Sequence, residues 1–113
     1  MGRQFQFHVE RLDVFKVTLE FITWVRTLDR NFLGGADREN QLRRAADSIA
    51  LNLAEGVGRG PGKSRAYHFG VAMGSASECA AVLAVLRLHG KDVAAGREQL
   101  GRIGAMINGL LRK

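Results

Sequence analysis

The sequence predicts an all-α protein, an antiparallel up-down-up-down four-helix bundle with a short extended N-terminal arm. Its 113 residues suffice for one domain around a single core and are too few for two. Apolar residues recur every three or four positions over most of the chain, which is the period of an amphipathic helix. Four such stretches are joined by short connections, and short connections place consecutive helices antiparallel. We therefore expect an arm over residues 1–12 and a bundle over residues 13–113.

The expected arm has a different period from the rest of the chain. Phe5, Phe7 and Val9 alternate with polar residues, which is the period of two found in strands. A single strand has no partner in this sequence. We therefore expect an extended segment whose apolar side lies on the bundle or on a neighbouring subunit.

The first two helices are bounded by residues that favour helix ends. The first should begin at Asp13 and stop at Gly34 and Gly35. The second should begin near Asp37 and run to the glycines that start at Gly56. Their apolar stripes are Val14, Thr18, Phe21, Val25, Leu28 and Phe32, then Leu42, Ala46, Ile49 and Leu53.

The third and fourth helices are also bounded by residues that favour helix ends. The third should start between Pro61 and Ser64, with Gly90 as its C-terminal cap, and Asp92 should open the fourth. Their stripes are Phe69, Ala72, Ala76, Cys79, Leu83 and Leu86, then Val93, Gly96, Leu100, Ile103, Ile107 and Leu110.

The connection between the second and third helices, EGVGRGPGKS, ends like a nucleotide-binding P-loop. A P-loop needs a glycine five residues before its Gly-Lys-Ser, and Val57 stands there. The segment also follows a helix and not a strand, so it reads as a helix hairpin turn. Arg59, Lys63 and Arg65 cluster in it. They form either a solvated turn or a contact to a phosphate backbone.

Charge makes polyanions plausible partners. The chain has 17 Lys and Arg against 11 Asp and Glu, a net charge of +6 and a pI near 10.4. The single cysteine, Cys79, reads as a small buried thiol. We see no signal-peptide core and expect no membrane span, which indicates a cytoplasmic protein.

Residues in patterns typical of catalysis are scarce. His8 and His68 have no Asp or Glu three or four residues away. Asp92 follows His89 by three residues, but the expected helix end at Gly90 lies between them, so no histidine shares a helix face with a carboxylate. Cys79 has no histidine near it in sequence, and no serine has a nucleophile-elbow context. We expect no enzyme activity, no metal and no cofactor.

A polar stripe runs beside the apolar stripe of the second helix and continues on the third. It is either a solvated face or a hydrogen-bonded seam between helices or subunits. The residues are Gln41, Arg44, Ser48, Asn52, Glu55 and Arg59, with Ser75 and Glu78 on the third helix.

A line of small residues on the third helix would let another helix approach closely. Together with the apolar stripe it provides this helix with two packing surfaces, and we therefore expect a homo-oligomer. The line is Gly70, Gly74, Ser77, Ala81 and Ala84.

Two ordered motifs resemble a known family. QLRRAADSIALNLAEGVGR (41–59) and FGVAMGSASE (69–78) are similar to the bacterial four-helix bundle proteins known as rRNA intervening-sequence proteins, and LDVFKVTLEF resembles their opening. Ala50 replaces the family's usual proline, so the second helix should be less kinked, and Met73 replaces an arginine. The matching residues are Gln41, Arg43, Arg44, Ser48, Asn52, Glu55, Gly56, Gly74, Ser75 and Glu78.

The resemblance implies a ring-shaped homopentamer, a loose association with nucleic acid and no enzymatic activity. One relative is the basic accessory protein of diversity-generating retroelements, which partners a reverse transcriptase. Five copies of a chain with net charge +6 would carry +30, a potential that one subunit cannot create.

The leading hypothesis is a non-enzymatic oligomeric bundle that binds RNA or DNA through backbone phosphates, without base-specific readout. Two alternatives stay open: an adaptor that docks a protein partner, and a small-ligand binder with a polar pocket formed by Asn52, Glu55, Ser75 and Glu78. The phosphate-binding candidates are Arg43, Arg44, Arg59, Lys63 and Arg65, followed by Lys16, Arg112 and Lys113.

Overall fold

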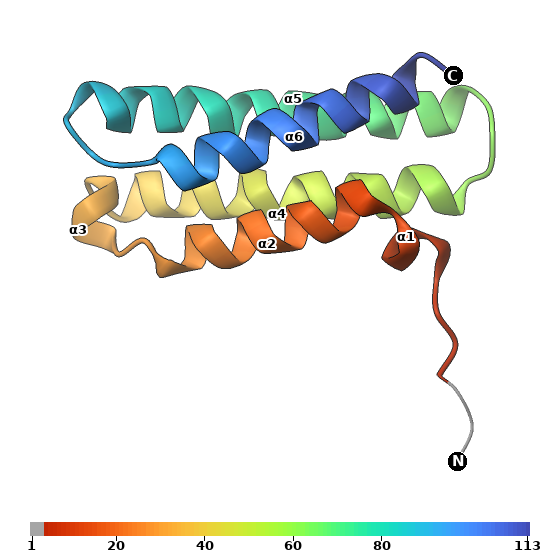
Figure 1. Cartoon of the computed structure of the whole chain (residues 1–113), viewed down its shortest axis with the longest axis horizontal. Helices are drawn as coiled ribbons and strands as arrows, with labels where there is room; N and C mark the ends of the chain where they lie inside the picture. The colour runs from red at the N-terminus through yellow and green to blue at the C-terminus, as the bar shows by residue number, and fades with distance from the viewer. Residues whose placement is uncertain (1–3) are drawn as a thin grey trace.

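The computed structural model describes residues 4–113, and this part of the chain is all-helical. Six helices and no strand are present in it (Figure 1). The helices are α1 (His8–Arg11), α2 (Asp13–Thr27), α3 (Arg30–Leu33), α4 (Ala36–Gly58), α5 (Lys63–Leu88) and α6 (Ala94–Leu111).

The four longer helices lie side by side around one core. α2 packs against α4 and α6, and α5 packs against the same two helices. In Figure 1 the α4–α5 loop and the C-terminus lie at one end of the molecule, while α3 and the α5–α6 connection lie at the other. Almost all the predicted stripe residues are buried, and only Phe32 and Leu110 are partly exposed. The helical period therefore located the core correctly.

The structure corrects the first predicted helix, which breaks after Thr27. Leu28 is extended, with φ −82° and ψ 123°, and α3 starts at Arg30. The cause is Asp29, whose carboxylate accepts a hydrogen bond from the Phe32 N–H at 2.7 Å and thereby caps a new helix. The break also rotates the last turn so that Leu33 is buried. Periodicity alone does not reveal a cap inside a continuous apolar stripe.

The extended arm is wrong for residues 8–11, which form helix α1. The Glu10 carboxylate accepts a hydrogen bond from the Phe7 N–H at 3.0 Å, and the Glu10 N–H donates to the Phe7 carbonyl at 3.0 Å. This reciprocal pair nucleates a helical turn too short to show a period of its own. Residues 4–7 have no regular structure, and the first three residues of the predicted arm lie outside the described residues.

The loop between α4 and α5 is the predicted helix hairpin turn. α4 runs unbroken through Ala50. Gly60 (φ +75°) and Gly62 (φ +134°) provide the left-handed backbone that reverses the chain. Gly56 has another role. A Cβ at this position would lie 2.6 Å from the Phe69 ring, so the lack of a side chain at Gly56 lets α5 approach α4 closely.

By length and composition, α5 is the one helix of residues 4–113 that could cross a membrane. In its most apolar 18-residue window, 39% is buried inside the protein. Core helices of soluble bundles share this length and composition. Here α5 packs on both α4 and α6 and carries Glu78 on its exposed side.

Candidate nucleic-acid interface

One end of the molecule gathers most of the excess positive charge. This basic end comprises residues 4–16, 55–68 and 108–113, which come from α1, the start of α2, the α4–α5 hairpin and the end of α6. It has seven Lys or Arg against three Asp or Glu, a net +4, whereas the other described residues have nine against eight, a net +1. The seven cations are Arg11, Lys16, Arg59, Lys63, Arg65, Arg112 and Lys113.

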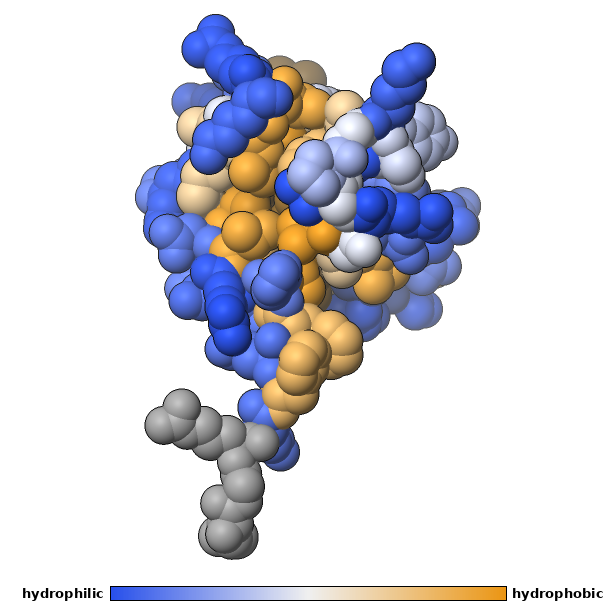
Figure 2. All heavy atoms as spheres, turned by 90° about the vertical axis from the view of Figure 1, so that its right-hand side faces the viewer, coloured by the Kyte–Doolittle hydropathy of each residue, from blue (hydrophilic) through white to orange (hydrophobic). Residues whose placement is uncertain are grey.

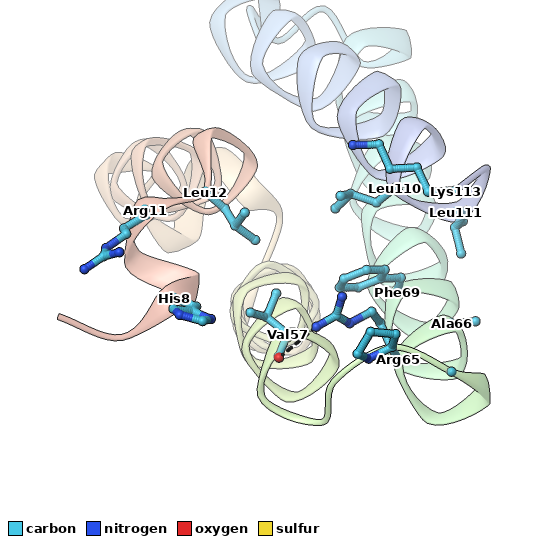
Figure 3. Close-up of a pocket in the computed structure, with 12 residues that line it drawn as sticks. His8, Arg11, Leu12, Val57, Arg65, Ala66, Phe69, Leu110, Leu111 and Lys113 are labelled. Carbon is cyan, nitrogen blue, oxygen red and sulfur yellow. Dashed lines mark hydrogen bonds between the residues drawn. The ribbon is translucent and has the colours of Figure 1, made fainter.

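A pocket of about 560 Å³ opens at the basic end, between α1, the α4–α5 hairpin and α6. Leu12, Val57, Phe69 and Leu110 contribute apolar surface to it (Figure 3). Figure 2 views this end directly and shows an apolar strip across it, with hydrophilic side chains on both sides. The basic end therefore combines an apolar hollow with a cationic surround.

Arg65 lies at this pocket but is held by the protein itself. Its Nε donates to the Gly56 carbonyl and its Nη2 to the Val57 carbonyl, each at 3.1 Å (Figure 3). These carbonyls belong to the last turn of α4, which lacks helical N–H partners and carries partial negative charge. Arg65 thus caps α4 and ties the start of α5 to it.

Arg59 and Lys63 are more accessible. Arg59 forms an ion pair with Glu55 at 3.2 Å, and both side chains are about half exposed. Lys63 is exposed and has no ion pair within residues 4–113. It lies in the first turn of α5, whose N-cap Gly62 provides no side-chain hydrogen bond. The backbone N–H groups there are left for an external acceptor.

The structure places the other two predicted cations far from this end. Arg43 precedes Arg59 by 16 residues of continuous helix, which is about 24 Å along its axis. Arg43 contacts the buried Glu39 at 3.5 Å, and Arg30 contacts the same carboxylate at 3.1 Å. Arg44 is exposed beside Asp47. The five predicted phosphate contacts therefore form two groups, not one.

The polar stripe forms hydrogen bonds between α4 and α5. The Ser75 hydroxyl donates to the Ser48 hydroxyl at 2.8 Å, and Asn52 Nδ2 donates to the Ser48 carbonyl at 2.9 Å. Asn52 Oδ1 lies 3.1 Å from His68 Nδ1. Gln41 Nε2 lies 3.4 Å from Glu78 Oε2, while Glu55 faces Arg59 instead.

The line of small residues lies on an exposed stripe of α5. Gly70, Gly74, Ser77, Ala81 and Ala84 are all exposed, and a Cβ added at either glycine would meet nothing within 4 Å. Tyr67 (68% exposed) and Leu88 (83% exposed) extend the stripe at its two ends at the same three- and four-residue spacing. We call these seven residues the α5 stripe.

The profile of the 23S rRNA-intervening sequence proteins matches residues 10–109. The chain belongs to this family. No curated protein and no solved structure matched it. The match includes the α4–α5 hairpin and leaves out two parts of the basic end, residues 4–9 and residues 110–113. Those parts carry Arg112, Lys113 and two exposed aromatic residues, Phe5 and Phe7.

Several residues of this family member were not assigned a role by sequence reasoning. His68 joins the seam, although we considered it only as a metal ligand. Arg11 was not recognised because it lies in α1, far in sequence from the hairpin it approaches. A spacing of four residues between Lys63 and Tyr67 on α5 could have shown that the stripe reaches the basic end.

Proposed function

We propose that this protein is a non-enzymatic, homo-oligomeric antiparallel four-helix bundle that binds RNA or DNA through backbone phosphates at its basic end. The uneven charge carries the proposal: the basic end holds net +4, and the rest of the described chain holds +1. Phosphate binding depends chiefly on local cation density. The rRNA context in the family's name agrees with a nucleic-acid partner.

Partner order along two helices supports the antiparallel arrangement. Gln41, Ser48 and Asn52 follow each other along α4, and their α5 partners Glu78, Ser75 and His68 run in reverse order. The Arg65 cap continues this order, because it joins the end of α4 to the start of α5. With α2 and α6 each packed on two neighbours, the four long helices form the bundle.

The cations at the basic end have different tasks in this proposal. Lys63, Arg112 and Lys113 are exposed and contact phosphates directly, as does Arg11 at the rim of the pocket. The N–H groups of the first α5 turn add hydrogen bonds to a phosphate oxygen. Arg59 exchanges its exposed carboxylate partner for a phosphate. Arg65 holds the hairpin in shape, and Arg43 and Arg44 are secondary contacts.

The α5 stripe supports self-association. Its seven residues are small or apolar and carry no charge, and they are exposed along the length of α5. The opposite side of α5 is buried in the core. Small side chains permit close helix approach between subunits. We propose a pentamer, as the family resemblance implies, in which five basic ends act together, and we place the protein in the cytoplasm.

The test combines binding and mass. Anisotropy of a labelled structured RNA is titrated with protein at several salt concentrations, and light scattering measures the mass. The triple variant Lys63→Glu/Arg112→Glu/Lys113→Glu should weaken binding and lower the log–log salt slope by about 2 to 3, because roughly 0.7 to 0.9 counterions are released per phosphate contact.

The matched control is Arg87→Glu/Arg97→Glu/Arg102→Glu, which changes the net charge by the same amount away from the basic end. These three arginines are exposed and have no ion pair within residues 4–113. Arg87 and Arg97 lie beside Ala84 and Leu88 of the α5 stripe, so light scattering must first show that the control keeps its mass. Equal losses of binding in both variants at unchanged mass would show that only total charge matters. Absence of binding at low salt in the wild-type protein would refute the proposed function.

The runner-up is an adaptor that docks a protein partner, and the α5 stripe is the observation that favours it. A complex that survives high salt would indicate apolar docking, because screening weakens phosphate contacts and not apolar burial. The small-ligand alternative has less support, since Ser48, Asn52 and Ser75 direct their polar atoms at one another.

A further inference from the structure

Two exposed phenylalanines lie at the basic end. The side chains of Phe5 and Phe7 are 78% and 63% exposed. Their rings pack edge to face, with centroids 4.9 Å apart and an interplanar angle of 84°. We call them the aromatic pair. Exposure of large aromatic side chains to water is unfavourable, so an exposed pair of this kind indicates a binding site.

The aromatic pair has an apolar hollow behind it. A depression of about 480 Å³ lies between the pair and the end of α4, and Phe15, Ala54 and Val57 line it. Val57 also lines the larger pocket next to it, so the two hollows adjoin. The one carboxylate at the depression, Glu10, is engaged by the Phe7 N–H at 3.0 Å.

We propose that the basic end prefers single-stranded nucleic acid, with an unpaired base stacked on the aromatic pair and its phosphates on the neighbouring cations. This inference rests on the proposed function and adds the strand state of the ligand. Sites for single strands combine cations with aromatic faces, because each unpaired base exposes a flat π-surface. A duplex keeps those surfaces inside its own stack.

Charge argues against a second copy of the chain as the occupant. A second copy that covered the aromatic pair with its own basic end would bring two net +4 surfaces into direct contact, whereas a nucleic acid offers phosphates to the cations and bases to the rings.

The experiment compares two labelled RNAs of the same length, one unstructured and one a duplex, by anisotropy at fixed moderate salt. Phe5→Leu/Phe7→Leu keeps apolar side chains but removes the rings. It should weaken single-strand binding by about tenfold and leave duplex binding and the salt slope unchanged. Phe5→Trp/Phe7→Trp replaces each phenyl ring with a larger aromatic ring and should keep or strengthen single-strand binding.

Fluorescence tests the stacking directly. In Phe7→Trp, the new indole should be quenched on addition of the single strand and much less by the duplex. The natural Trp24, stacked on Phe21 with ring centroids 5.9 Å apart, serves in the wild-type protein as the control that should change little. Circular dichroism and light scattering on each variant confirm that helix content and mass are retained.

Three outcomes would overturn the inference and leave the proposed function standing. They are equal wild-type affinity for both RNAs, equal loss for both RNAs in the leucine variant, and a fall in mass in that variant, which would make the pair a subunit contact. Failure of the wild-type protein to bind either RNA at low salt would refute the proposed function itself.

Discussion

The double change Gly70→Ala/Gly74→Ala tests the α5 stripe as a contact between subunits. Both glycines are exposed on the helix, and an added Cβ meets nothing within 4 Å of either in the single chain. Alanine is favoured over glycine inside a helix by about 1 kcal/mol. The free energy of unfolding of the isolated subunit should therefore rise, by about 1 to 2 kcal/mol for the pair.

Association should change in the opposite direction. If another helix packs on the stripe, two new methyl groups hold it away, and such overpacking costs about 1 to 3 kcal/mol, which weakens association by about 5- to 150-fold. Urea unfolding at low protein concentration, where light scattering shows the monomer, measures the first effect. Mass against concentration measures the second.

Gly109→Ala is the matched control for this experiment. Gly109 is also exposed, lies in α6 and has nothing within 4 Å of an added Cβ, so alanine should stabilise the subunit without altering its mass. If Gly70→Ala/Gly74→Ala stabilises the subunit and leaves the oligomer intact, the stripe is a solvated face and the reasoning is refuted. A loss of subunit stability would contradict the open space seen at both positions.

Three further predictions concern the hairpin and the core. Gly56→Ala should lower the free energy of unfolding, measured in urea, by about 1 to 2 kcal/mol, because the clash with the Phe69 ring exceeds the gain in helix propensity. A higher free energy of unfolding would show that the ring moves aside freely. Arg65→Ala should lower the free energy of unfolding by about 1 to 2 kcal/mol, since the Gly56 carbonyl loses its side-chain donor and the Val57 carbonyl keeps only the Gly60 N–H at 3.5 Å. Arg44→Ala, at an exposed position, should change it by less than about 0.5 kcal/mol; equal effects would remove the capping role. Burial, reinforced by Glu78, raises the pKa of the Cys79 thiol to about 12 from 9.0, so a thiol reagent at neutral pH should label it only after unfolding. In the unfolded chain the thiol ionises near pH 9, but in the folded protein only near pH 12. The free energy of unfolding should therefore fall as pH rises from about 9 to about 12, and Cys79→Ala should lose that part of the pH dependence.

The helical parts of the fold and the position of the core were predictable from local information. A period of 3.6 in residues such as Leu42, Ile49 and Leu53 identifies the buried side of α4 without knowledge of what covers it. The hairpin turn followed from its glycines and from the helix before it. The N-terminal turn and the break after Thr27 were not predictable in this way, because single carboxylates, Glu10 and Asp29, cap helices there.

The candidate site was predictable only in part. The sequence by itself determined that the chain is basic, that cations gather in the hairpin and that polar residues share a side of α4. Only the tertiary structure showed that the Arg65 guanidinium is hydrogen-bonded to the end of α4 and that Arg43 pairs with Glu39. It also showed that cations of α1 and of the end of α6 lie beside the hairpin. The physical reason is that helix period is a local property, whereas the charge density and pairing of a surface depend on which distant segments the fold brings together.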